Sequence, residues 1–104
     1  MSSELVIRVE NTERGPLVYV SGEIDIYTAQ QFKDDLYQVV DGSESDVTID
    51  CIGLNYIDST GLGIFVGALK KTKLNGRNIY IINMKDNIKK LFVITGLDKL
   101  FIIN

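Results

Sequence analysis

The stretch that decides the fold is Asn55–Lys71, NYIDSTGLGIFVGALKK, in which Asp-Ser-Thr leads into an apolar run interrupted by glycines. This run predicts a helix from about Ser59 to Leu74, although each glycine inside a helix costs roughly 1 kcal/mol relative to alanine. Serine at a helix start is usually an N-cap, but Asp58 is an alternative cap, so Ser59 need not have that role. The glycines therefore require a reason beyond helix formation.

A helical wheel separates two sides of this helix. The apolar side, predicted to face the core, consists of Leu62, Phe65, Val66 and Leu69. An adjacent side with almost no side-chain bulk consists of Thr60, Gly63 and Gly67, with Ile64 and Ala68 farther round. Missing side chains permit a close approach to the backbone. A neighbouring helix of the same domain and a partner protein are both compatible with this pattern.

The start of this helix is suited to an anion. A helix N-terminus has free N–H groups and the positive end of the helix dipole. A phosphate on Ser59 would add roughly −1.5 to −2 charges there, and the local structure would accept it. A docked partner that places a carboxylate or an apolar patch at this position would not tolerate the added charge.

Further elements alternate along the chain on both sides of this helix. Strands are predicted at residues 4–10, 16–22, 46–54, 78–83 and 100–103, and helices within residues 25–42 and 84–96. The strand at 46–54 carries apolar residues on both faces, which is typical of a central strand. In the helix within 25–42, Thr28 is the predicted N-cap, with Gln31 completing a capping box, and Gly42 is the predicted stop.

The order strand-strand-helix-strand-helix-strand-helix-strand predicts an α/β domain. The first strand should be antiparallel to the second because a short turn joins them, and right-handed crossovers should make the other pairs parallel. The length of 104 residues suits a single domain spanning the whole chain, residues 1–104.

Composition narrows the functional classes. The chain has 11 basic and 14 acidic side chains, so the net charge of −3 gives no sign of a nucleic-acid partner. Lys70, Lys71 and Lys73 are interpreted as a solvated helix end. Cys51 is the single cysteine, is predicted to be a small core residue, and suits a reducing compartment. Apolar runs stay below the roughly 18 residues of a membrane span and no signal peptide is visible, so we expect a cytoplasmic protein.

The residues predict neither an enzyme nor a cofactor or metal site. The chain contains no histidine, which removes the commonest general base and metal ligand. Asp25 and Asp58 are candidates to pair across loops, but no nucleophile and base accompany them. Gly61 and Gly63 lack the third glycine of a dinucleotide-binding loop and the Gly-Lys-Ser/Thr of a P-loop.

Three segments together resemble a known family. IDSTGLGIFVGALKK (57–71) looks like the phosphorylation motif of the bacterial anti-sigma factor antagonists, which carry the STAS domain. VSGEIDIYTAQQF (20–32) resembles the second signature of this family, and LFVITGLDKLFII (91–103) resembles its C-terminal segment. The likeness is greatest to the general-stress type, with the sporulation type a near relative. It implies a STAS fold: a mixed sheet of about five strands with helices packed mainly on one face.

The resemblance also implies a mechanism. The unphosphorylated antagonist binds an anti-sigma factor that is also a serine kinase, and this binding frees a sigma factor for transcription. The kinase phosphorylates the motif serine and releases the antagonist, and a PP2C-type phosphatase restores it. The chain is expected to be a monomer or weak dimer without contact to nucleic acid or membrane. The alternative is a STAS module of a larger signalling scaffold, or a cytosolic partner of a transporter.

By motif match, the phosphorylated residue is Ser59. The partner-facing positions implied by the resemblance are Asp25 with Gly22 and Glu23 in its loop, and Asp58, Thr60, Gly61 and Gly63 in the motif. The wheel adds Ile64 and Gly67 as candidates for the partner surface.

Overall fold

The computed structural model describes residues 4–104, and it contains the elements that the sequence predicts, in the predicted order. The strands are β1 (Leu5–Thr12), β2 (Gly15–Ile24), β3 (Val47–Ile57), β4 (Ile79–Ile82) and β5 (Ile102–Ile103). The helices are α1 (Ala29–Asp41), α2 (Ser59–Leu74) and α3 (Asp86–Ile94), followed by a short 3-10 helix, η1 (Leu97–Lys99), which was not predicted.

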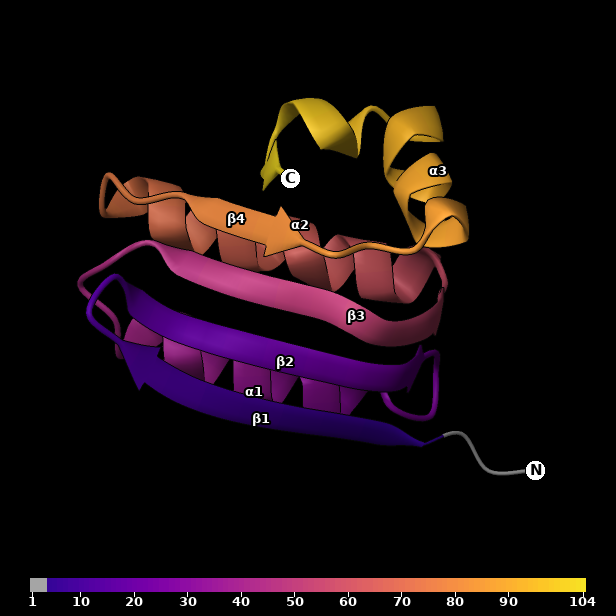
Figure 1. The fold of residues 1–104 in the computed structure, drawn as a ribbon, viewed down its shortest axis with the longest axis horizontal. Helices are drawn as coiled ribbons and strands as arrows, with labels where there is room; N and C mark the ends of the chain where they lie inside the picture. Colours follow the sequence, from indigo (N-terminus) through magenta and orange to yellow (C-terminus); the bar gives the residue numbers. More distant parts are fainter. Residues whose placement is uncertain (1–3) are drawn as a thin grey trace.

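The strands form one sheet in the order β1-β2-β3-β4-β5 (Figure 1). β1 is antiparallel to β2, and every later neighbouring pair is parallel, as predicted. The carboxyl ends of the parallel strands β2, β3 and β4 therefore lie together, next to the starts of α1, α2 and α3, on the right of Figure 1. The candidate functional residues lie at this end of the sheet.

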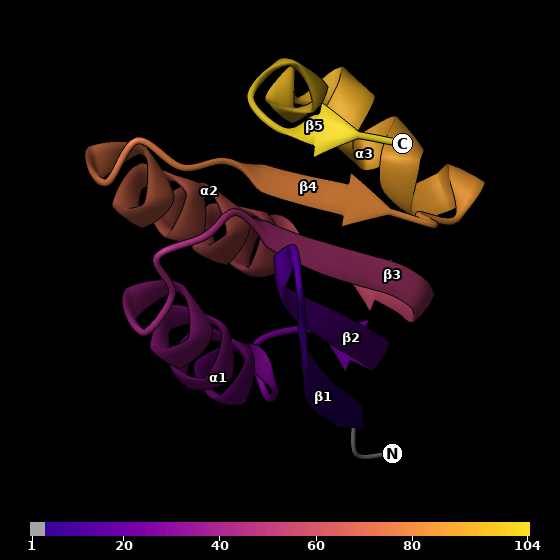
Figure 2. The same ribbon diagram turned by 60° about the vertical axis from the view of Figure 1, so that its left-hand side comes forward.

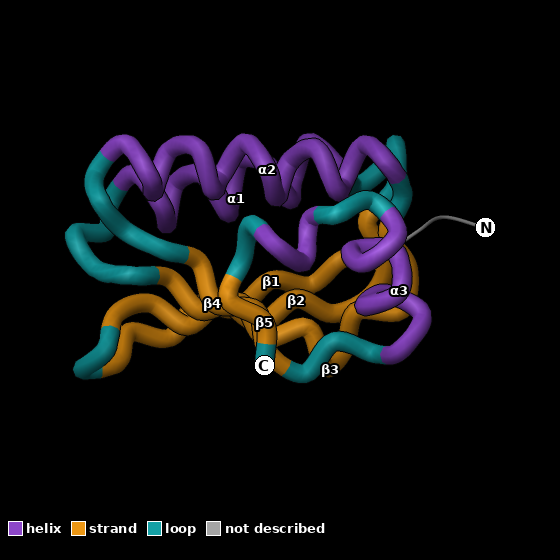
Figure 3. The backbone as a smooth tube through the Cα atoms, turned by 90° about the horizontal axis from the view of Figure 1, so that it is seen from above, coloured by secondary structure: helices purple, strands orange, loops and turns teal. Residues whose placement is uncertain are grey.

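The helices cover one face of the sheet and leave the other uncovered. Figure 3 shows α1 and α2 side by side in a layer over the strands, and Figure 2 shows α3 beside β4 and β5. β3, the strand predicted at 46–54, is the central strand of the sheet, as predicted. The apolar residues on its two faces differ in burial: Ile52 is exposed on the uncovered side, whereas its neighbour Cys51 is fully buried. The confirmed interior place of Cys51 raises the pKa of its thiol to about 12, mainly through burial and then through the charge of Asp50.

The core is centred on Phe65 of α2. Its ring centroid lies 5.2 Å from that of Phe32 in α1, 5.4 Å from Phe92 in α3 and 6.1 Å from Phe101 before β5. All four rings are buried. They fix the position of α2 relative to both other helices and the C-terminal segment, and so hold the start of α2 at the strand ends.

The predicted core face of α2 is partly wrong. Ile64 and Ala68, placed outside the core by the wheel, are buried, whereas Val66, placed inside it, is only half-buried. The reason is that α2 packs against two neighbours, the sheet beneath it and α1 beside it. The second neighbour widens the buried arc toward Ile64 and Ala68.

The start of α1 also differs from its prediction. Thr28 does precede the first helical residue, but its side chain makes no cap bond. Its hydroxyl donates to the Glu23 carbonyl at 2.7 Å and accepts from the Asp25 N–H at 3.0 Å. Gln31 donates to the Leu5 carbonyl on β1, so the capping box does not form. Tertiary contacts with β1 and the preceding loop occupy both side chains. Gly42 ends the helix as predicted.

Candidate functional site

Ser59 is the first residue of α2, and its side chain is exposed. Within residues 4–104 its hydroxyl takes part in no hydrogen bond. Thr60 beside it is exposed as well. The motif therefore presents a hydroxyl group to solvent at a helix N-terminus.

Asp58 performs the capping of α2. Its backbone is extended, with φ −110° and ψ −174°, and its Oδ1 accepts a hydrogen bond from the Gly61 N–H at 3.1 Å. Its carbonyl accepts from the Leu62 N–H at 3.0 Å. This answers the question of which residue is the cap. Because Asp58 satisfies the first turn, the Ser59 side chain has no structural duty there.

A second segment lies beside Ser59. Ile24 and Ile57 are partners in the parallel register of β2 and β3, and the Asp58 N–H donates to the Ile24 carbonyl at 3.3 Å. The loop from β2 to α1 therefore starts next to the start of α2. In this loop Ile26 is 69% exposed and Tyr27 is 80% exposed. The sequence-based hypothesis missed both, although two large apolar residues directly after a strand end were a signal for them.

The Asp25 carboxylate is engaged within the same loop. Its Oδ1 accepts from the Tyr27 N–H at 2.9 Å and from the Thr28 N–H at 3.1 Å. The residue is half-buried, and Glu23 before it is exposed. The prediction that Asp25 faces a partner remains a prediction, while its bonds to the loop backbone have an evident structural role: they hold Ile26 and Tyr27 outward.

The three glycines of α2 differ in what surrounds them. A Cβ on Gly61 would lie 2.6 Å from Ile57 Cγ1 and 2.7 Å from Ile24 Cγ2, so this glycine lets α2 sit on the two strand ends. A Cβ on Gly67 would collide with the Tyr37 hydroxyl of α1. Gly63 is exposed, and a Cβ added to it would meet nothing within 4 Å among residues 4–104.

The remaining predicted residues also divide into those that pack inside the domain and those that are exposed. Gly22 has φ +103°, a backbone conformation that L side chains rarely adopt, and its missing side chain makes room for the Glu4 carbonyl. Ile64 is only 8% exposed, so its prediction as part of an open surface is wrong. Ser59 and Gly63 are four residues apart on one side of α2. We call the exposed set Ile26, Tyr27, Ser59, Thr60 and Gly63 the Ser59 surface.

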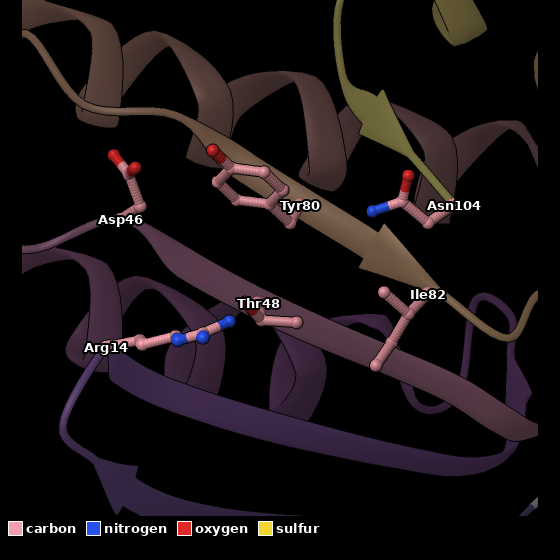
Figure 4. Close-up of a pocket in the computed structure, with 6 residues that line it drawn as sticks. All are labelled: Arg14, Asp46, Thr48, Tyr80, Ile82 and Asn104. Atoms are coloured by element: carbon pink, nitrogen blue, oxygen red, sulfur yellow. The ribbon is translucent and has the colours of Figure 1, made fainter.

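A hollow of about 420 Å³ lies elsewhere, on the uncovered face of the sheet. Figure 4 shows its lining, with the Arg14 guanidinium pointing toward Thr48 and with Tyr80 lying along β4. Its lining runs from Asp46 and Thr48 at the start of β3 to Ile82 at the end of β4 and Asn104 after β5, and it includes no predicted site residue. Within residues 4–104, no group of three or more His, Cys, Asp or Glu side chains is placed to hold a metal ion. None of the helices in that same range is long and apolar enough to cross a membrane.

Known proteins resemble this chain over most of its length. The family model of the STAS domain matches residues 6–104. The anti-sigma-B factor antagonist of Staphylococcus epidermidis is 40% identical over 87 residues, which cover 84% of this chain and 81% of that protein. The counterpart from Staphylococcus aureus strain NCTC 8325 is 39% identical over the same length, with the same coverage of both chains.

A solved structure has the same architecture. The crystal structure of an anti-sigma factor antagonist from Mycobacterium paratuberculosis superposes with a TM-score of 0.82 and 28% identity, and covers 96% of this chain and 85% of that one. The family model, the curated relatives and the shared fold agree with the likeness seen in the three sequence segments. This chain therefore belongs to the STAS domain family, as a relative of the bacterial anti-sigma factor antagonists.

Proposed function

We propose that this chain is an anti-sigma factor antagonist whose binding is switched by phosphorylation of Ser59. The observation that carries the proposal is the exposed Ser59 hydroxyl, free of hydrogen bonds within residues 4–104, at a helix start that Asp58 already caps. A kinase can reach this hydroxyl without unfolding the helix. The names of the relatives at 40% and 39% identity support the choice of an anti-sigma factor as the partner.

In this proposal the unphosphorylated chain binds an anti-sigma factor that is also a serine kinase, and thereby frees a sigma factor in the cytoplasm. The Ser59 surface is the centre of contact. Ile26 and Tyr27 supply apolar anchors of the kind that dominate protein interfaces, and Gly63 allows the partner to approach the α2 backbone. Glu23 and Asp25 border this centre. A PP2C-type phosphatase removes the phosphate and restores binding.

The remaining predicted residues pack behind the Ser59 surface. Gly22 and Gly61 allow β1 and the strand ends to pack closely, Gly67 accommodates Tyr37, and Ile64 belongs to the core. Asp58 fixes the first turn of α2. In this proposal these residues act on partner binding through the packing that positions Ser59, and the half-buried Gly22, Asp58 and Gly67 remain candidates for contact at the border.

The switch acts on binding and leaves the fold intact. A phosphate brings roughly −1.5 to −2 charges to the helix N-terminus, which is favourable for the free chain. In a complex the same charge, left unpaired against the partner, costs several kcal/mol. Roughly every 1.4 kcal/mol is a tenfold loss of affinity, so phosphorylation should abolish binding at cellular concentrations.

The first test is a pull-down from lysate of the source cell with ATP present, followed by intact mass and peptide mapping of the bait. We expect a kinase-like anti-sigma factor to copurify and one phosphate to appear on Ser59 of the wild type. Ser59→Ala should capture the partner without being modified, and Thr60→Ala is the matched control that should behave as wild type. An unmodified wild-type bait without such a partner would refute the proposal.

Titration calorimetry with the captured partner then tests the charge mechanism. Ser59→Asp and the phosphoprotein should both bind at least tenfold more weakly than the wild type, whereas Ser59→Ala should bind equally well. Wild-type affinity in the phosphoprotein would show that the charge at Ser59 is not the switch.

A further inference from the structure

A second exposed feature lies at the opposite end of α2. A shallow groove of about 680 Å³ is lined by Val66, Leu69, Lys70, Lys73 and Leu74 of α2 and by Leu100 from the segment between η1 and β5. Leu69 is buried and forms the floor, while Leu74 is 87% exposed and Leu100 is also exposed. The groove begins at Val66, about one turn beyond Gly63, and extends away from the Ser59 surface to Leu74, about 22 Å along the helix axis from Ser59.

The groove is apolar at its centre and basic at its rim. Four of its six lining side chains are aliphatic, and the other two are the exposed lysines Lys70 and Lys73. Isolated exposed leucines are common on protein surfaces, but a contiguous hollow of them framed by charge marks an interaction site more often.

The charges at this end of α2 are arranged unevenly. Lys71 points to the α1 side, where its amine forms an ion pair with Asp41 at 3.2 Å. Lys73 donates to the neutral amide of Asn78, and Lys70 forms no ion pair within residues 4–104. The acid nearest along the chain to Leu100, Asp98, is half-buried with one carboxylate oxygen withdrawn from solvent. The rim of the groove is therefore positive, although the chain as a whole has a net charge of −3.

We propose that this groove binds an acidic amphipathic helix of a partner protein. The α2 part of the groove, from Val66 to Leu74, extends about 12 Å along the helix axis, which is room for two turns of a bound helix. Such a helix would place apolar side chains at i, i+3, i+4 and i+7 against Val66, Leu69, Leu74 and Leu100. Its acidic residues would flank the apolar face and meet Lys70 and Lys73. The proposal goes beyond the switch at Ser59 and does not depend on it.

The test uses a synthetic helical probe and the full chain. The probe is a peptide of about 18 residues, long enough to be partly helical in water, with leucines at i, i+3, i+4 and i+7 and glutamates on the flanks. A second peptide carries lysines in place of the glutamates. We expect the glutamate peptide to shift the amide NMR signals of the groove residues and to bind at least tenfold more tightly than the lysine peptide, since all flanking charges of the peptide change sign relative to Lys70 and Lys73.

Variants of the chain locate the interaction. Lys70→Glu combined with Lys73→Glu should reverse the preference between the two peptides. The matched control, Lys89→Glu combined with Lys90→Glu on α3, changes the net charge by the same amount and should keep the wild-type preference. Leu74→Ser should weaken binding of the glutamate peptide about tenfold, whereas Ile52→Ser on the uncovered sheet face should not. Both leucine and isoleucine are exposed, so neither variant is expected to unfold the chain.

Several results would overturn the proposal. Equal binding of both peptides would mean that charge does not select the partner, and NMR shifts outside the groove would place the site elsewhere. Binding to vesicles containing phosphatidylserine, lost in Leu74→Ser while the glutamate peptide fails to bind, would identify a lipid surface as the occupant. Ser59→Asp should bind the glutamate peptide as the wild type does, so failure of the groove and failure of the Ser59 switch can be told apart.

Discussion

Two strand ends of this molecule share the dipeptide Ile-Asp and use it differently. β2 ends at Ile24, followed by Asp25, and β3 ends at Ile57, followed by Asp58; the two isoleucines are partners in register. Each aspartate accepts hydrogen bonds from N–H groups that follow it. The aspartate accepts backbone hydrogen bonds at both strand ends, but the side chains exposed after it differ.

The difference lies in how soon the helix begins. After Asp58 the helix starts at the next residue, so the group displayed is the hydroxyl of Ser59. After Asp25 three residues precede the first helical residue, Ala29, and the loop displays Ile26 and Tyr27. One strand end thus offers a site for a charge and the other an apolar anchor. In the proposed mechanism, a charge at Ser59 controls the apolar contact that Ile26 and Tyr27 make with the partner.

The largest expected effect is that of a substitution at Gly61, where the ends of β2 and β3 both contact α2. We expect Gly61→Val to lower the free energy of unfolding by about 3 kcal/mol, because overpacking against two branched side chains forces the helix away from the sheet. Urea denaturation measures this loss. The matched control is Gly63→Val, whose side chain enters open space and should change the stability by no more than about 0.5 kcal/mol. Equal losses in both variants would mean that Gly61 is not a contact point.

The second test compares the two aspartates. We expect Asp25→Ala to cost about 2 kcal/mol, because it removes the acceptor of the Tyr27 N–H and of the N–H of the buried Thr28. Asp58→Ala should cost about 1 kcal/mol, the usual loss for an N-cap. Thermal and urea denaturation of both variants check the order. A larger loss for Asp58→Ala would mean that the cap of α2 contributes more to stability than the hydrogen bonds of Asp25.

The third test separates binding from stability at the apolar strand end. Tyr27→Ala should change the free energy of unfolding by no more than about 0.5 kcal/mol, because the ring is exposed. The same variant should weaken binding of the anti-sigma partner about tenfold, as expected for an aromatic anchor. Calorimetric titration measures the affinity. Wild-type affinity would remove the loop from the interface, and Ile52→Ala on the uncovered sheet face is the control that should bind normally.

The smallest expected effect is that of Ser59→Ala on stability. Because Asp58 caps α2 and the Ser59 hydroxyl is not hydrogen-bonded within residues 4–104, the free energy of unfolding should change by less than about 0.5 kcal/mol. A loss of about 1 kcal/mol or more in urea denaturation would make Ser59 a structural cap after all.

Features of the site that depend on contacts between residues close in the sequence could be predicted, and features that depend on contacts between distant residues could not. The boundaries of α2 depend on residues within one helical turn and could be inferred from the pattern. The pattern left both Ser59 and Asp58 as candidates for the cap, and the structure selects Asp58. The roles of Thr28 and Gln31 could not, since their hydrogen bonds reach Glu23 and Leu5 in the preceding strands. Ile64 was misplaced because a helical wheel includes no neighbouring helix, and α1 covers that side of α2.

By itself, the sequence determined the order of strands and helices, the parallel and antiparallel pairs and the position of Ser59 at a helix start. Hydrophobic period, turn residues and caps are local, so they can be read along the chain. Only the tertiary structure decided the separate roles of the three glycines. Gly61 touches two strands and Gly67 touches α1, whereas Gly63 faces open space among the described residues 4–104. The physical reason is that a missing side chain has meaning only through what occupies the space, and that is set by segments distant in the sequence.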